Sequence, residues 1–167
     1  YLSCLRRFYD LNSGRPDSAG LNQEKYIFGA CDAAALYRRQ ALKDVKQSST
    51  YFDEDFFGLV EDVDISWRLN KKNWACLYLP GVVALHRRGL SRQRDRFTQY
   101  LNFRNRYLML IKNETGWGFL RLPLVFLVYD LWRILWMLLT NTRYTLKACA
   151  EIAVLTPRMM RKRQEHA

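Results

Sequence analysis

Cysteine is scarce in this sequence, and the four residues present are far apart: Cys4, Cys31, Cys76 and Cys149. There is no Cys-x-x-Cys pair, which argues against a zinc knuckle and a disulfide framework. Reduced thiols of a cytosolic protein are the simpler interpretation. The chain also lacks a charged-then-apolar leader and opens at Tyr1, so we expect it to be a fragment.

Acidic residues are also in short supply. The chain has 27 Lys and Arg against 16 Asp and Glu, a formal net charge of +11 over 167 residues. This excess indicates an anionic partner such as nucleic acid, phospholipid headgroups or a phosphorylated substrate. No nucleic-acid motif is present, and the aromatic residues lie mostly in apolar runs, so nucleic acid is disfavoured. The length and 49% hydrophobic content suit one domain with a sizeable core.

Six of the few carboxylates are crowded into twelve positions: Asp53, Glu54, Asp55, Glu61, Asp62 and Asp64. Like charges at this spacing repel one another, so we expect a cation, a proton or a hydroxyl substrate to balance them. A structural alternative exists, because carboxylates in the first turn of a helix are stabilised by the macrodipole. Asp64 and Arg68 are four residues apart, which predicts a structural ion pair.

Periodicity and punctuation predict the local structure. We expect a loop over 11–25, a strand or buried segment over 26–37, a helix over 39–45, a helix over 61–72, a strand over 74–79 and a helix over 93–112 with arginines on its outer faces. A second apolar run over 82–85 ends at His86, where a strand end would meet ligands. A lone histidine in this setting is more often structural.

The C-terminal region from residue 114 onward is both apolar and basic. Arg121, Asp130 and Arg133 interrupt the apolar stretch 119–139, and a charge at the centre of a bilayer costs about 2.5 to 3.5 kcal/mol. Asp130 and Arg133 are one turn apart, so we expect a shared polar face and helices lying in the membrane interface rather than crossing it. A pair of ordinary core helices is the alternative.

Carboxylates and an imidazole brought to one rim would suit Mn2+ or Mg2+, and such a metal suits phosphate-bearing substrates. Several segments in series resemble the C-terminal half of family 2 glycosyltransferases, most of all the bacterial rhamnosyltransferase-like branch. They are Phe28 to Cys31, Ala34 to Arg39, Phe52 to Phe57, Glu61 to Leu69, Tyr78 to His86 and Tyr100 to Tyr107.

The resemblance implies an α/β fold, the acceptor-side half of a Rossmann-like GT-A domain over 1–113, followed by amphipathic helices over 114–167. It implies an inverting transfer from a nucleotide-diphosphate sugar to a polyprenyl-linked glycan acceptor in bacterial cell-surface polysaccharide synthesis. Asp62 would be the catalytic base and Glu61 would orient the acceptor. His86 would hold the divalent metal, while Arg104 and Arg106 would bind phosphate.

The predicted location is cytoplasmic, peripheral on the inner face of the cell membrane. The family's Asp-x-Asp, which binds metal and nucleotide in the donor half, does not occur upstream of the acceptor region. Two other interpretations therefore stay open. One is a noncatalytic remnant that binds glycan or membrane, and the other is a basic module that binds nucleic acid.

Overall fold

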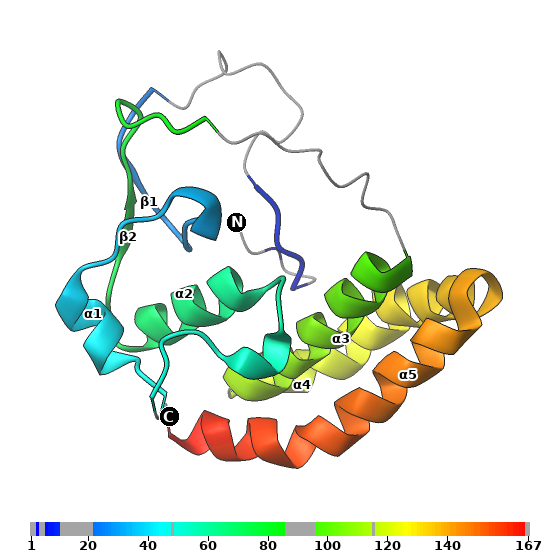
Figure 1. The fold of residues 1–167 in the computed structure, drawn as a ribbon. Coiled ribbons are helices and arrows are strands. Elements are labelled where there is room, and N and C mark those ends of the chain that lie inside the picture. The colour runs from blue at the N-terminus through cyan, green and yellow to red at the C-terminus, as the bar shows by residue number, and fades with distance from the viewer. Residues whose placement is uncertain are drawn as a thin grey trace. The chain divides into compact units, whose positions relative to one another are not determined.

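A computed structural model describes residues 3, 6–10, 22–47, 49–85, 96–114 and 116–165. The described part of the chain is mostly helical, with one two-stranded sheet (Figure 1). It divides into two compact units, unit 1 within Tyr1–Asp53 and Glu61–Leu90, and unit 2 within Glu54–Val60 and Ser91–Ala167. This division differs from the predicted boundary at residue 113, because the helix that ends there packs against the C-terminal helix.

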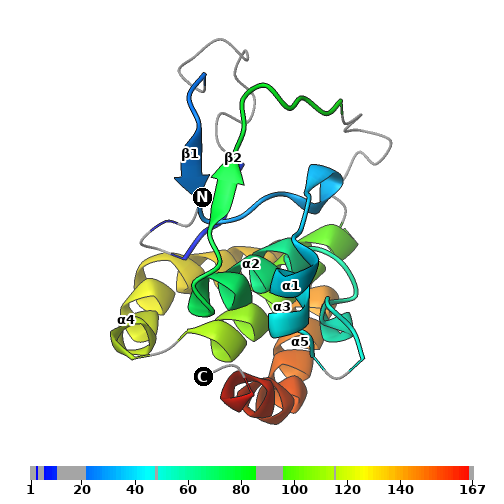
Figure 2. The same ribbon diagram turned by 90° about the vertical axis from the view of Figure 1, so that its left-hand side faces the viewer.

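Unit 1 contains the sheet and two α-helices. β1 (Lys25–Ile27) pairs antiparallel with β2 (Cys76–Tyr78), as two views show (Figures 1 and 2). Helix α1 (Arg39–Asp44) packs on α2 (Glu61–Lys71). Their shared core consists of Ala41, Val45, Ile65 and Leu69. The predicted helices over 39–45 and 61–72 and the strand within 74–79 are confirmed.

Two strand predictions in unit 1 are wrong. Beyond Ile27, the segment 26–37 forms only a short 3-10 helix, η1 (Asp32–Ala34), and Leu36 is fully exposed. Residues 82–85 form no strand, and Val82 and Leu85 are also exposed. An apolar segment forms a strand only where it can pair with a neighbouring strand. The described sheet consists of β1 and β2 alone, so residues 28–37 and 82–85 pair with no strand in it.

A buried ion pair stabilises the core of unit 1. Arg68 Nε lies 2.9 Å from Asp64 Oδ2, and both side chains are fully buried. The same guanidinium donates to the carbonyl oxygens of Val45 and Tyr51. The predicted Asp64–Arg68 pair is therefore confirmed, and it ties α2 to the chain that follows α1.

Unit 2 is built on two long helices. α3 (Arg96–Asn113) packs along α5 (Leu131–Gln164), and the two lie side by side in both ribbon views (Figures 1 and 2). α4 (Trp117–Val125) continues into α5 through a π-helical turn, η3 (Phe126–Asp130). The core contains Tyr100, Leu101, Phe103, Met137 and Ala148. The helix expected over 93–112 is confirmed for residues 96 onward, and the C-terminal region is helical as predicted.

Helix α5 bends around α3. Asn141 has non-helical dihedral angles (φ −152°, ψ 48°) in the middle of α5, and its side-chain amide donates to the carbonyl oxygen of Arg96, 3.1 Å away. The hydroxyl of Thr145 donates to the carbonyl oxygen of Asn141 at 2.9 Å, and a side chain inserted into the backbone ladder in this way is a known cause of a kink. The bend keeps both halves of α5 within reach of α3.

The segment that precedes α2 adopts an unusual backbone in unit 2. Phe57, Leu59 and Val60 have positive φ angles of 64°, 67° and 75°, which are strained for residues other than glycine. Asn105 of α3, fully buried, donates to the carbonyl oxygens of Phe56, Gly58 and Leu59 at 2.7 to 2.9 Å. These bonds offset the backbone strain and hold the segment in place.

Candidate functional site: an acidic cluster at the start of α2

The first turn of α2 presents two carboxylates, Glu61 and Asp62, both half-buried. Asp62 Oδ1 accepts a hydrogen bond from the backbone N–H of Val63 at 2.8 Å. Free N–H groups and the helix dipole stabilise negative charge at this end of a helix. The local sequence thus explains how a carboxylate can be placed here, but not why water is partly excluded from it.

Close packing of another segment on α2 explains the partial burial. Asn70 Nδ2 donates to the carbonyl oxygen of Phe28 at 2.8 Å, and the Phe28 ring meets Trp67 edge to face at 5.9 Å. A Cβ atom on Gly29 would lie 2.0 Å from Ser66 Oγ, far inside van der Waals contact. Only glycine allows the backbone to come this close to α2.

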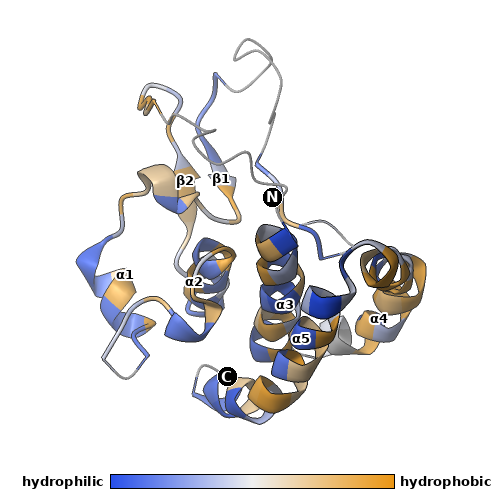
Figure 3. Ribbon diagram, turned by 45° about the vertical axis from the view of Figure 1, so that its right-hand side comes forward, coloured by the Kyte–Doolittle hydropathy of each residue, from blue (hydrophilic) through white to orange (hydrophobic). Residues whose placement is uncertain are grey.

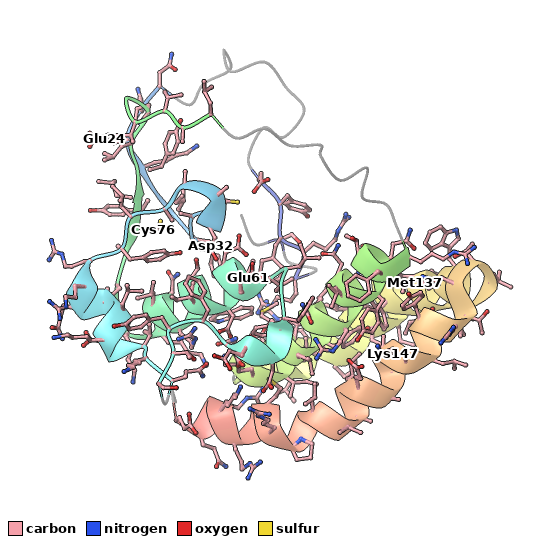
Figure 4. All side chains as sticks on the ribbon, in the orientation of Figure 1. Glu24, Asp32, Glu61, Cys76, Met137 and Lys147 are labelled. Atoms are coloured by element: carbon pink, nitrogen blue, oxygen red, sulfur yellow. The ribbon has the colours of Figure 1, made fainter. Side chains whose placement is uncertain are left out.

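The same segment continues to Asp32 and so adds a third carboxylate. The backbone N–H of Asp32 donates to the Asp62 carboxylate. The hydroxyl of Tyr37 donates to Asp32 Oδ1 at 3.0 Å. Figure 4 shows Asp32 and Glu61 near each other at the start of α2. We refer to Asp32, Glu61 and Asp62 as the acidic cluster.

Burial raises the pKa of all three carboxyls, and nearby negative charges raise it further. Loss of hydration is the largest cause for Asp62, opposed by the hydrogen bonds from Val63 and Asp32, and the charge of Asp10 raises the pKa of Asp62 further. Loss of hydration also raises the pKa of Glu61, with the charges of Asp62 and Asp32 adding to it. Asp32 is exposed as a residue, yet partial shielding of its carboxyl and the charge of Asp62 raise its pKa despite the Tyr37 bond.

One oxygen of the cluster is left without a partner. Glu61 Oε2 is buried, and among the described residues nothing donates a hydrogen bond to it. A buried acceptor without a donor is destabilising by about 1 to 3 kcal/mol, so such atoms call for an explanation. A bound hydroxyl would satisfy this oxygen. The cluster can therefore accept hydrogen bonds from a polyol and take up a proton.

Arg104 and Arg106 lie in unit 2 and are buried, so the predicted outward arginine face is wrong for these two. Arg104 Nε lies 2.6 Å from Glu151 Oε2. Arg106 Nη1 lies 2.7 Å from Asp130 Oδ1, with both side chains almost fully buried. Each guanidinium already has a carboxylate partner, and phosphate would have to compete with it. Phosphate binding by Arg104 and Arg106 stays a prediction.

The predicted metal ligand His86 lies outside the described residues. Among those described, no group of three or more His, Cys, Asp and Glu side chains could hold a metal ion. The acidic cluster alone therefore does not fit Mn2+ or Mg2+, and metal binding through His86 stays a prediction.

Sequence reasoning missed the contributions of Gly29, Asp32 and Tyr37. Asp32 itself has no local signal in the sequence, because Glu61 and Asp62 are about 30 positions away in the chain. The signal was the Phe-Gly-Ala-Cys segment, since a glycine flanked by larger residues often marks a close backbone approach. That approach is what places Asp32 beside the start of α2.

This chain is similar to few known proteins. No family model matches, and no solved structure matches significantly. Two curated proteins match, both named N-acetylglucosaminyl-diphospho-decaprenol L-rhamnosyltransferase, from Mycobacterium tuberculosis strains CDC 1551 / Oshkosh and ATCC 25618 / H37Rv. Each is 32% identical over 93 residues, 55% of this chain. The match spans 28% of the length of these relatives, and it supports a relationship to glycosyltransferases in the broad sense.

Proposed function

We propose that this chain is the acceptor-side part of an inverting glycosyltransferase with a GT-A fold, and that Asp62 is its general base. The observation that carries the proposal is the acidic cluster, where a half-buried carboxyl of raised pKa adjoins a buried Glu61 oxygen to which no described residue donates a hydrogen bond. The similarity to two rhamnosyltransferases supports the same reaction class. The proposed donor is a nucleotide-diphosphate sugar.

The proposed acceptor is a polyprenyl-linked glycan, used in bacterial cell-surface polysaccharide synthesis. The names of the two relatives contain a diphospho-decaprenol acceptor, which supports a lipid-linked acceptor for this chain. Glu61 Oε2 would accept a hydrogen bond from a sugar hydroxyl and so orient the acceptor. A ligand hydroxyl at this oxygen would remove the cost of the unsatisfied group.

The reaction would proceed in one step. The acceptor hydroxyl oxygen attacks the anomeric carbon as the bond from that carbon to the diphosphate breaks, and the hydroxyl proton passes to Asp62. Attack from the face opposite the leaving group inverts the anomeric configuration. General-base assistance is typically worth about 10² to 10⁴ in rate. Arg104 and Arg106 are not needed for this proton transfer, and each is held by a carboxylate of unit 2.

The raised pKa of Asp62 sets the expected pH dependence. A base works only when deprotonated, so activity should fall as the pH drops through its pKa. Because burial raises the pKa of Asp62 above its ordinary 3.8, the acid limb of kcat/KM should lie above that value. A limb at or below 3.8 in the native full-length protein would contradict the assignment.

The decisive experiment is Asp62→Asn in the native full-length protein. Asparagine keeps the shape and the acceptor oxygen for the Val63 N–H but cannot take the proton. We expect kcat to fall by about 10² to 10⁴ while nucleotide-sugar binding is retained. The matched control is Glu24→Gln, an exposed carboxylate of unit 1, which should leave kcat unchanged. Wild-type turnover by the Asp62 variant would remove this residue from the mechanism.

A further inference from the structure

Large apolar side chains line one exposed face of the helical stretch that runs from α4 through η3 into α5. Leu139 is 87% exposed, Trp132 67% and Trp136 54%. Figure 3 shows hydrophobic colour along α4 and the turns that follow it. We call this face the outer stripe and define it by Leu120, Leu124, Leu127, Trp132, Trp136 and Leu139.

The π-helical turn keeps the outer stripe on one side. Successive stripe residues are separated by four, three, five, four and three positions, and steps of three and four return to the same helical face. The step of five, from Leu127 to Trp132, falls where η3 (Phe126–Asp130) widens the helix to the i to i+5 pattern. Without that turn, the two halves of the stripe would be rotated apart.

Two of the three charges within this apolar stretch, Asp130 and Arg133, are turned away from the stripe. Asp130 is only 2% exposed and lies 2.7 Å from Arg106 of α3. The guanidinium of Arg133 lies 5.5 Å from the centroid of the Phe103 ring, also on α3. The predicted polar face shared by Asp130 and Arg133 is therefore an internal contact with α3. The outer stripe is left without an acidic group.

Exposed basic residues flank both ends of the stripe. Arg121 stands next to its first residue, and Arg143 and Lys147 follow its last. Each basic side chain near an anionic leaflet contributes about 1 kcal/mol of attraction. Exposed tryptophans prefer the level of the headgroups, where an apolar ring and a polar N–H are both accommodated. Charge and side-chain type therefore both suit a phospholipid surface.

Length alone would also allow a crossing, since Leu120–Gln164 is long and apolar enough by length and composition to span a bilayer. The contact with α3 argues against it. α3 packs along this stretch and contains Arg104, Arg106 and Lys112, which would have to enter the hydrocarbon with it. Each charge there costs about 2.5 to 3.5 kcal/mol on insertion scales. A helix lying in the interface avoids that cost.

We propose that the outer stripe docks flat on an anionic phospholipid bilayer, with its apolar side chains at the headgroup and acyl boundary. The internal Arg106–Asp130 pair makes this possible by removing a carboxylate from the membrane-facing side. The proposal concerns unit 2 alone and does not depend on sugar transfer. Its failure would leave the acidic cluster untouched.

The test is flotation of the full-length protein with vesicles of equal parts phosphatidylcholine and phosphatidylglycerol. The variant is Trp132→Ser with Trp136→Ser, and both sites are exposed, so the fold should be retained. We expect its partitioning to weaken about tenfold or more, given the transfer free energy of two large aromatic side chains. The matched control, Leu36→Ser with Leu85→Ser, replaces two exposed leucines of unit 1 and should bind as the wild type does.

Four outcomes would overturn the proposal. The first is flotation of the tryptophan variant that equals flotation of the wild-type protein. The second is binding of the wild-type protein to vesicles of phosphatidylcholine alone that equals its binding to the mixed vesicles. Resistance of the wild-type protein to alkaline extraction would indicate a crossing instead. A wild-type dimer that the tryptophan variant converts to monomer, with flotation unaffected, would assign the stripe to a second copy. Circular dichroism verifies that the tryptophan variant is folded. Quenching of the wild-type tryptophan fluorescence by brominated lipid tests contact with the bilayer in the protein without substitutions.

Discussion

Asp62 and Asp64 are two residues apart on α2, and their carboxylates have opposite surroundings. Asp64 is fully buried and lies 2.9 Å from the Arg68 guanidinium. Asp62 is half-buried beside Glu61 and Asp32, and among the described residues no basic side chain forms an ion pair with these three. The first arrangement stabilises a charge, whereas the second makes a proton easier to accept. Position on the helix therefore separates a carboxylate paired with a guanidinium from one whose pKa is raised.

The carboxylates of unit 2 resemble Asp64. Asp130 pairs with Arg106, and Glu151 lies 2.6 Å from Arg104. Asp55 lies 2.7 Å from Lys162 Nζ, which ties η2 (Glu54–Phe56) to the end of α5. A basic chain has enough cations to pair its few acids. Among the described residues, no basic side chain is paired with the cluster of Asp32, Glu61 and Asp62, and functional sites are where such arrangements concentrate.

Breaking the buried pair should have the largest effect on stability. Arg68→Met removes the guanidinium from the buried Asp64 carboxylate. We expect the free energy of unfolding to fall by about 3 to 5 kcal/mol. Hydrogen exchange of the α2 amides would measure the change in unit 1 directly.

An exposed ion pair supplies the control for Arg68→Met. Lys147 and Glu151, 3.8 Å apart on α5, are both solvent-accessible, and Lys147→Met should change stability by less than about 1 kcal/mol. Equal effects of the two substitutions would mean that burial does not distinguish the pairs. Burial could then not explain why the surroundings of Asp64 and Asp62 have different effects on their carboxylates.

Displacing the segment that carries Asp32 should have an intermediate effect. Gly29→Ala places a methyl group 2.0 Å from Ser66 Oγ and 2.3 Å from Ser66 Cβ, so the segment must move away from α2. Overpacking of this kind costs about 1 to 3 kcal/mol. The pKa of Asp62 and of Glu61 should shift back toward ordinary values as water returns, which carboxyl NMR titration would detect.

Two further variants make the Gly29 prediction specific. Ser66→Gly combined with Gly29→Ala removes the clashing side chain and should restore most of the lost stability. Gly58→Ala is the control, because a Cβ there meets nothing within 4 Å. If the double variant is as unstable as Gly29→Ala alone, room for the close approach to Ser66 is not the role of Gly29.

The smallest expected effect is on how the free energy of unfolding depends on pH. Because the folded-state pKa of Asp62 is raised, its contribution to stability is fully present below the ordinary value of 3.8 and is lost as pH rises through the folded-state pKa. Asp62→Asn removes the charged form, so the variant should be slightly more stable than the native protein at pH 7. The gain should vanish in acid. A variant that is less stable at pH 7 would place Asp62 among the stabilising carboxylates.

Local patterns predicted much of the secondary structure. Apolar spacing placed the helices over 39–45 and 61–72, and the spacing of four residues predicted the Asp64–Arg68 pair. These features depend on residues close in the chain, which interact through helical geometry. The sequence also singled out Glu61 and Asp62 as candidates, through acidic crowding in a basic chain.

Long-range contacts were beyond such patterns. Asp32 reaches α2 because Gly29 permits a close approach to Ser66, 37 positions later in the chain. Arg106 and Asp130 looked like surface charges, yet they pair inside unit 2 across 24 positions. Neither the Gly29–Ser66 approach nor the Arg106–Asp130 pair leaves a periodic signal in the sequence. Contacts between distant segments depend on how those segments pack, and not on the spacing of residues along the chain.

By itself, the amino-acid sequence determined which segments are helical, where acidic residues gather and which stretch is apolar. Tertiary structure alone decided which carboxylates receive a cation and which do not. The physical reason is that a charge is stabilised or destabilised by water and by groups within a few ångströms, and those neighbours come from distant parts of the chain. Packing thus left Asp62 poised to accept a proton and gave Asp64 and Asp130 their arginines.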